Sequence, residues 1–289
     1  AVQDIQMACD QLAHVHRATD GADGYVSIEV SPHLAHDTHA TVEQARHLWR
    51  SVHRPNVMIK VPATDAGVQA IENLTAEGIN VNVTLLFSVE RYEQVFAAWV
   101  RGLEDCADPR SIASVASFFV SRVDGVVDPR LRAAGGDALG HRHQTAIANA
   151  KMAYQAFERL RREPDFQAQA RRGARVQRPL WASTSSKDPN LADTFYVDHL
   201  IGPDTVNTVP PKTLDAYLEH GTAAVTIDDD LEQAQATLDT VARHGIDLRA
   251  VARELEADGV QKFVDSHDAL VSALHDKIGE VTTRYAAES

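Results

Sequence analysis

The sequence has only two cysteines, Cys9 and Cys106, and it has no long apolar run. The two cysteines form neither a metal-binding motif nor a disulfide framework, so a reducing cytoplasm is the expected location. No stretch approaches the roughly 18–20 apolar residues of a membrane helix, and no signal peptide is visible. We therefore expect a cytoplasmic protein without a membrane partner.

Positive charge is also scarce. The chain has 28 Lys and Arg residues against 41 Asp and Glu residues, which gives a net charge of −13. Because phosphate backbones are bound by clustered Lys and Arg, we expect no nucleic-acid partner. An anionic small molecule would need a local positive pocket. Only six of the positive residues are lysines, and one of them, Lys60, lies in the apolar stretch NVMIKVP.

Short apolar runs alternate with helical patterns along most of the chain. Strands are predicted at residues 25–30, 56–62, 79–87, 112–123, 178–184 and 205–210. Apolar residues at helical spacing predict helices at 4–16, 38–52, 65–78, 88–105, within 127–162, and at 211–221, 229–245 and 248–278. Residues 162–177 are the best candidate for a loop. Thr38 or Thr41 is the expected cap of the second helix, Ser88 that of the helix at 88–105, and Gly78 a helix stop.

Strand–helix alternation is typical of parallel sheets, which form either open sheets or closed barrels. The pattern within the strands separates the two. Glu29, Lys60, Asn82 and Thr84 alternate with apolar residues, so three consecutive strands have one apolar and one polar face. Strands of an open parallel sheet are usually apolar on both faces. A polar face fits the lumen of a barrel, so we predict an α/β fold of the (β/α)8 TIM type.

The predicted strands are fewer than a closed barrel contains. Six are visible, whereas a TIM barrel has eight. We expect the two remaining units, at roughly 30 residues each, to precede Ala1. The chain is predicted to be a single barrel domain over 1–289, with a helical insertion and loop region at 127–177 and C-terminal helices at 222–289. The oligomeric state stays open.

Lys60 is the candidate catalytic residue. It lies near the C-terminal end of its strand, where barrel enzymes carry their catalytic groups. Shielding from water lowers the pKa of a lysine amine, and the neutral amine attacks carbonyl carbons. The resulting imine draws electrons from a neighbouring C–C bond, which can then break and leave an enamine. A lysine that only reaches toward solvent is the alternative, and the polar residues on the neighbouring strands argue against it.

Several stretches together resemble one family. They occur in order from about residue 20 to the C-terminus and read VSIEVSPHLAHDT, NVMIKVPATDAGVQAI, EGINVNVTLLFS, ASFFVSRVD, RPLWASTSSKDP and TVNTVPPKTLDA. The chain resembles the transaldolases, in particular their long actinobacterial-type branch. The resemblance implies a class I transferase of the pentose phosphate pathway that needs no metal or other cofactor. It implies transfer of a dihydroxyacetone unit from sedoheptulose 7-phosphate to glyceraldehyde 3-phosphate, giving erythrose 4-phosphate and fructose 6-phosphate.

The resemblance also implies roles for particular residues. Lys60 corresponds to the Schiff-base lysine of the family. Glu29 corresponds to the glutamate that moves protons through a water during imine formation and hydrolysis, and Thr84 to the threonine that holds this water. Asn82 and Ser117 correspond to residues that bind the dihydroxyacetone part of the substrate.

Phosphate recognition is implied for a second group of residues. Arg122 corresponds to a phosphate-binding arginine, and a guanidinium binds phosphate through two parallel hydrogen bonds. A second arginine of the shorter family branch would fall in STSSKD, where Ser183 is the expected substrate-binding residue and Lys187 the expected positive charge.

The sequence departs from the family pattern in one important respect. The acid–base aspartate and the Thr-Thr-Asn-Pro motif of the family are absent from these 289 residues, in agreement with the strand count. Without the aspartate, C–C cleavage would be slowed by about 10²–10⁴. A non-catalytic relative that binds sugar phosphates is therefore the alternative. His33, His36 and His39 have metal-like spacing, but solvated side chains are the expected interpretation, and a metal-dependent hydrolase ranks far behind.

Overall fold

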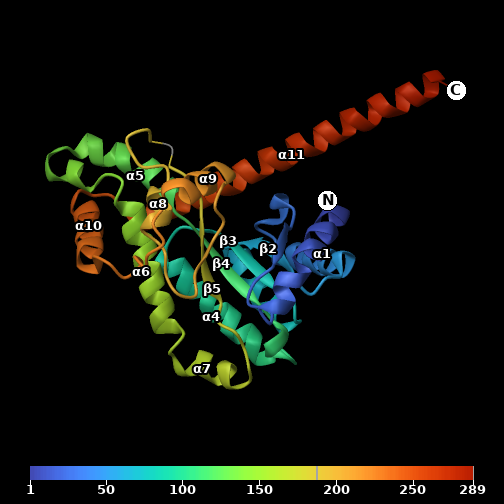
Figure 1. The fold of residues 1–289 in the computed structure, drawn as a ribbon, viewed down its shortest axis with the longest axis horizontal. Coiled ribbons are helices and arrows are strands. Elements are labelled where there is room, and N and C mark those ends of the chain that lie inside the picture. The colour runs from blue at the N-terminus through green and yellow to red at the C-terminus, as the bar shows by residue number, and fades with distance from the viewer. Residues whose placement is uncertain (187, 289) are drawn as a thin grey trace.

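The computed structural model describes residues 1–186 and 188–288, with side chains described up to residue 278. Its centre is a six-stranded parallel sheet in which the strands follow one another in chain order. The strands are β1 (Val26–Glu29), β2 (Val57–Pro62), β3 (Val81–Leu86), β4 (Ser114–Phe119), β5 (Arg178–Ala182) and β6 (Val206–Asn207). The sheet curves as part of a TIM-type barrel does (Figure 1), so the predicted fold class is confirmed. The expectation of two further units before Ala1 stays a prediction.

Helices surround the sheet (Figure 1). They are α1 (Val2–Ala18), α2 (Thr38–Val52), α3 (Asp65–Ala76), α4 (Val89–Asp105), α5 (Ser121–Ala134), α6 (Thr145–Leu160), α7 (Pro164–Arg171), α8 (Phe195–Asp198), α9 (Pro211–His220), α10 (Leu231–Arg243) and α11 (Leu248–Glu288). Short 3-10 turns are η1 (Pro32–Leu34), η2 (Pro109–Ser111) and η3 (Gly136–His141). No described helix is long and apolar enough to cross a membrane.

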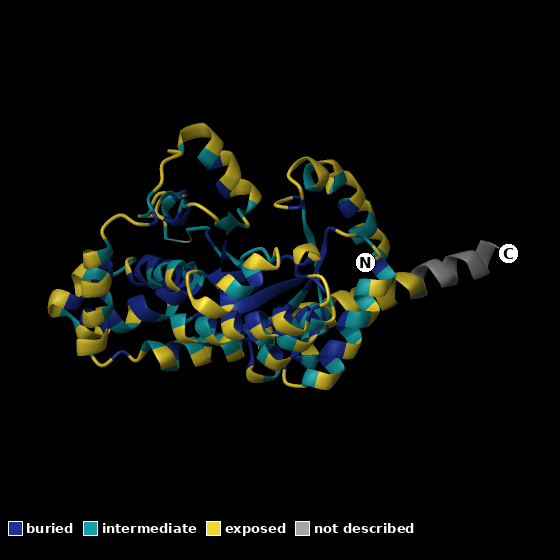
Figure 2. Cartoon of the chain, turned by 90° about the horizontal axis from the view of Figure 1, so that it is seen from below, coloured by how far each residue is buried: buried dark blue, intermediate teal, exposed yellow. Residues whose placement is uncertain are grey.

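The two faces of the sheet differ as the alternation predicts. Val57, Ile59, Val61, Val81 and Val83 are fully buried against the helices. Figure 2 shows the buried residues concentrated around the sheet. Burial of apolar side chains at about 25 cal/mol per Å² is the main force that holds this layer together. The opposite face carries the polar side chains and lines a cavity.

Side chains cap the starts of α2, α3 and α4, and the caps of α2 and α4 test the expectations from the sequence. Asp37, and not Thr38 or Thr41, caps α2, because its carboxylate accepts a hydrogen bond from the N–H of Ala40. The two threonines are engaged elsewhere: Thr38 donates to Ala66 O and Thr41 donates to Leu34 O. The expected caps were therefore wrong: the carboxylate of Asp37, one residue before Thr38, accepts the hydrogen bond that caps the helix. Ser88 caps α4 as expected, by accepting from the N–H of Arg91.

Three expected element bounds were wrong. The strand expected over 112–123 ends at Phe119, and residues from Ser121 onward form α5. The expected loop at 162–177 contains α7, which begins at Pro164, a residue that suits the first helical turn. The strand expected over 205–210 is reduced to Val206–Asn207. For the two strands, short-range patterns identified the element but not its ends, whereas the helix α7 was missed altogether.

A buried carboxyl group joins three helices beside the sheet. Asp124 of α5 is 3% exposed. The N–H of Ala146 in α6 donates to its Oδ1 at 2.8 Å, and the hydroxyl of Tyr196 in α8 donates to its Oδ2 at 2.9 Å. Burial raises the pKa of Asp124 from 3.8 to about 7, although the hydrogen bond from Ala146 opposes the rise. The folded chain therefore binds a proton here more tightly than the unfolded chain does.

Asp124→Asn should remove one pH dependence of stability. Folding raises the pKa of Asp124. The stabilising contribution of its proton is therefore complete below pH 3.8, the pKa of the unfolded chain, and it is lost as the pH rises through about 7 in the folded chain. Between these limits the free energy of unfolding of the unmodified chain should fall by on the order of 4 kcal/mol more than that of D124N. Urea unfolding across this pH range checks it. Equal pH dependence of the two proteins would contradict this account of Asp124.

Candidate active site

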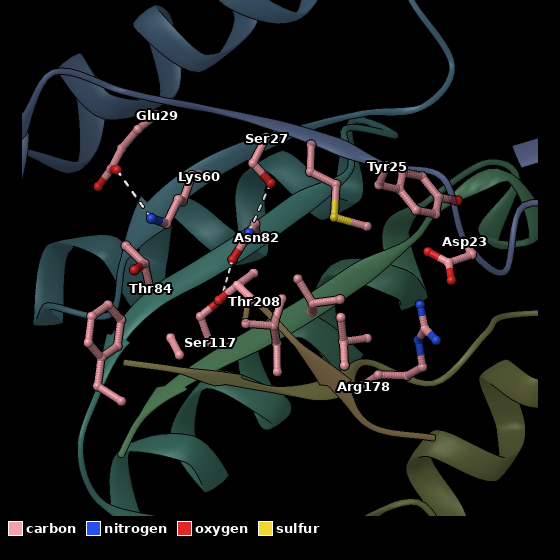
Figure 3. A pocket seen from close by; sticks show the side chains of 16 residues that line it. Asp23, Tyr25, Ser27, Glu29, Lys60, Asn82, Thr84, Ser117, Arg178 and Thr208 are labelled. Carbon is pink, nitrogen blue, oxygen red and sulfur yellow. Dashed lines mark hydrogen bonds and ion pairs between the residues drawn. The ribbon is translucent and has the colours of Figure 1, made fainter. Parts of the chain in front are cut away.

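A cavity of about 400 Å³ lies on the polar face of the sheet. Side chains from all six strands or the residues next to them point into it (Figure 3). Its lining includes Asp23, Tyr25, Ser27, Glu29, Met58, Lys60, Asn82, Thr84, Val115, Ser117, Phe119, Arg178, Leu180, Ala182, Val206 and Thr208. Within each strand these are alternate residues, as the period of two in a strand requires. The cavity is thus a direct result of the alternation in the sequence.

Lys60 and Glu29 form an ion pair at this cavity. They are partners in the parallel register of β1 and β2, and Lys60 Nζ lies 3.4 Å from Glu29 Oε2. Their side chains are 25% and 28% exposed, so water still reaches both groups. Burial raises the pKa of the Glu29 carboxyl above its usual range, and the positive charge of Lys60 offsets part of that rise. An amine beside a carboxyl group with a raised pKa is suited to the proton transfers of imine chemistry.

Hydrogen bonds hold the amide of Asn82 in a fixed orientation. Asn82 is the register partner of Lys60 on β3. Ser117 Oγ donates to Asn82 Oδ1 at 2.7 Å, and Asn82 Nδ2 donates to Ser27 Oγ at 2.9 Å (Figure 3). This chain links β4, β3 and β1 across the floor of the cavity. The hydroxyl and amide groups together form a polar surface beside Lys60.

Thr84 lies beside a local distortion of β3. The β3–β4 register shifts between Val83 and Leu86, and Leu85 has a φ of 59° although it is not glycine. Such a bulge redirects the side chains of a strand and is frequent near active sites. Thr84 is fully buried, and its hydroxyl has no hydrogen-bond partner among the described residues. The expected alternation of Leu85 with Val81 and Val83 is interrupted here, and Leu85 lies against Gly259 of α11.

Arg122 lies outside the first cavity. It belongs to the first turn of α5 and lines a second cavity of about 800 Å³, together with Ser121 and Lys262. Its guanidinium lies over the ring of Phe119, 4.9 Å from the ring centroid. Phe119 lines the first cavity, so its ring contacts both that cavity and the guanidinium of Arg122. The Nη1 atom of Arg122 is buried and has no protein partner among the described residues.

Ser183 lies close to Arg122 in the fold. Its carbonyl accepts from the N–H of Ser121, and the two serine hydroxyls are 3.0 Å apart. Ser183 has a φ of 57°, an unusual backbone conformation for a serine. It is absent from the residues that line the first cavity. Lys187 lies outside the described residues.

α11 contributes a residue that sequence reasoning missed. It packs against α5, η1 and β3 (Figure 1). Lys60 Nζ lies over the ring of Phe263, 5.4 Å from its centroid. α11 comes close to β3 at Gly259, where an added Cβ would lie 2.8 Å from Leu85 Cδ2. Nothing in the local sequence links residue 263 to residue 60. Ser27 was also missed as a site residue. The sequence did indicate it, because Ser27 precedes Glu29 by two residues and therefore lies on the same face of the strand.

The histidines with metal-like spacing do not gather in the fold. His33 lies with His267 and Asp268, and not with His36 or His39. His33, His36 and His39 are all exposed, in agreement with the expectation of solvated side chains. None of the three lines the cavity that contains Lys60.

Comparison with known proteins identifies the family. A family model described as Transaldolase/Fructose-6-phosphate aldolase matches residues 1–274. The chain is 53% identical over 276 residues to a protein named transaldolase from Acidothermus cellulolyticus, covering 94% of this chain and 74% of that protein. It is 51% identical over 276 residues to a transaldolase from Mycolicibacterium smegmatis, with 93% and 74% covered. It is 50% identical over 285 residues to a transaldolase from Thermobifida fusca, with 96% and 77% covered. The chain therefore belongs to the transaldolase/fructose-6-phosphate aldolase family.

Proposed function

We propose that this chain carries out transaldolase chemistry through an imine on Lys60. The observation that carries the proposal is the position of Lys60 Nζ in the cavity, 3.4 Å from the carboxylate of Glu29. The relatives that match nearly the whole chain at about 50% identity are named transaldolases, which supports the same reaction. The substrates are sugar phosphates, with a dihydroxyacetone unit passing from sedoheptulose 7-phosphate to glyceraldehyde 3-phosphate.

The first half of the reaction is imine formation. The ammonium of Lys60 gives a proton to the Glu29 carboxylate, and the resulting neutral amine attacks the C2 carbonyl carbon of the ketose and gives a carbinolamine. Loss of water from C2, with protons moved between Glu29 and a water held by Thr84, leaves the imine. The hydroxyl of Thr84 is buried and has no hydrogen-bond partner in the described part of the chain, which supports its role in binding that water. Hydrolysis reverses the same steps after transfer.

The second half is cleavage of the C3–C4 bond. The bonding electron pair moves into the protonated imine and gives an enamine on Lys60, while the proton of the C4 hydroxyl goes to a base and an aldehyde leaves. The family resemblance assigns that base to an aspartate whose motif these 289 residues do not contain. Asn82 and Ser117 are proposed to bind the hydroxyl groups of the dihydroxyacetone unit, because their fixed dipoles surround Lys60.

The phosphate group is proposed to bind at Arg122. A phosphate needs charged donors, and Arg122 has a buried guanidinium nitrogen without a protein partner among the described residues. Ser183, 3.0 Å from Ser121 through the hydroxyl groups, would contact the same end of the substrate, with Lys187 adding positive charge. The non-catalytic alternative is not favoured, because the relatives that match nearly the whole chain are named transaldolases. We also place the reaction in the cytoplasm, within the pentose phosphate pathway, and propose a single domain over residues 1–289.

Borohydride trapping tests the imine. Incubation with fructose 6-phosphate and borohydride should add one reduced dihydroxyacetone or fructose phosphate unit to the peptide that contains Lys60. Lys60→Arg should abolish the adduct, because a guanidinium does not form a stable imine. Lys212→Arg, which changes an exposed lysine at the start of α9, is the matched control and should leave it intact. Peptide mass spectrometry locates the adduct, and an adduct on another lysine would overturn the proposal.

Glu29→Gln should slow imine formation without preventing substrate binding. Loss of a general acid–base group costs about 10²–10⁴ in rate. Because the pKa of Glu29 is raised above 4.5, its ionised form is lost as the pH falls through that raised value, and the trapping rate should fall with it. This part of the pH profile should disappear in E29Q. Glu256→Gln, which changes another partly buried glutamate with a raised pKa, should retain it. An unchanged profile in E29Q would show that Glu29 moves no proton.

A further inference from the structure

Two histidines and an aspartate meet between η1 and α11. His33 Nε2 lies 2.7 Å from Asp268 Oδ1, and His267 Nδ1 lies 3.1 Å from the same oxygen. The two imidazole rings are 5.6 Å apart at an angle of 81°. The fold brings them together across 235 positions of the chain. They are the only group of three metal-capable side chains found among the described residues.

The geometry of this cluster is close to that of a metal site. One ligand atom from each residue lies within 4.8 Å of the other two. A tetrahedral zinc ion, with bonds of about 2.0–2.1 Å, needs ligand atoms about 3.3 Å apart. The observed 2.7 and 3.1 Å contacts join both imidazoles to one oxygen of Asp268, so the ligand atoms must move apart by up to about 0.6 Å to admit the ion. All three side chains are at least partly exposed, so an ion can enter from solvent.

The donor set selects a class of ion. Imidazole nitrogens suit zinc, copper and nickel, whereas magnesium and calcium prefer ligands that are all oxygen. Two imidazoles and one carboxylate leave a fourth position for water, as in many zinc sites with three protein ligands. We infer that His33, His267 and Asp268 form a binding site for a divalent transition-metal ion of the zinc class, which fastens α11 to η1.

The proposed metal site lies close to the cavity that contains Lys60, so a bound ion would affect that cavity. η1 begins three residues after Glu29, the last residue of β1. His267 follows Phe263 by one helical turn on α11, and Phe263 lies over Lys60. An ion bound to both elements would hold Phe263 over the amine and restrict opening of α11. This inference goes beyond the proposed reaction, which needs no metal, and it does not depend on that reaction.

Calorimetric titration with Zn²⁺ tests the site in the chain without any histidine tag. The unmodified chain should bind one equivalent. His33→Ala and Asp268→Asn should each weaken this binding at least tenfold, because each removes one of three ligands. His39→Ala, which removes another exposed histidine of the same segment, is the control and should bind as the unmodified chain does. Equal binding by H33A, or loss of binding in H39A, would overturn the inference.

Hydrogen exchange tests the proposed link between η1 and α11. Zn²⁺ should slow amide exchange around residues 260–270 of α11 in the unmodified chain and leave it unchanged in H33A, which lacks the ligand on η1. The surface position of these side chains means that the variants should fold normally. Binding without slower exchange would contradict the fastening of α11, and failure of either test leaves the chemistry of Lys60 unaffected.

Discussion

The ion pair between Lys60 and Glu29 depends on the parallel register of the first three strands. That register places Glu29, Lys60 and Asn82 in one row across the polar face. Charged groups are costly to remove from water, and Lys60 and Glu29 each reduce that cost for the other. The pair contributes little net stability by itself. Its importance is that the amine of Lys60 remains in the cavity on one face of the sheet, while the other face is a buried layer of valine and isoleucine.

The curved sheet and the centre of the cavity could be predicted from the sequence, because both follow from a period of two in short strands. Glu29, Lys60, Asn82 and Thr84 all line the predicted polar face, and Ser117, which only the family resemblance had implied, lines the same cavity. The position of Arg122 could not be predicted in the same way. The apolar run that ends at Val123 continues through the strand into α5, and only tertiary packing fixes the boundary at Phe119. Phe263 and the meeting of His33 with Asp268 depend on contacts over more than 200 positions, for which local patterns carry no information.

Two residues with left-handed backbone conformations occur near the cavity. Leu85 follows Thr84, and Ser183 contacts the helix turn that carries Arg122. Neither residue type favours a positive φ, which costs on the order of 1–3 kcal/mol unless the surroundings hold it. The packing of Leu85 against Gly259 is one such contact, and it also brings α11 over β3. The same helix carries Phe263, so the distortion of β3 and the cover over Lys60 are parts of one arrangement.

The central claim is that this polar face presents the amine of Lys60 to a ketose beside Glu29 and the hydrogen-bonded pair Asn82–Ser117. A crystal structure of the borohydride-reduced complex with fructose 6-phosphate tests it most directly. The account predicts continuous density from Lys60 Nζ to C2 of the sugar, substrate hydroxyls within hydrogen-bond distance of Asn82 and Ser117, and the phosphate near Arg122. A sugar bound away from this row, or attached to another lysine, would contradict the account.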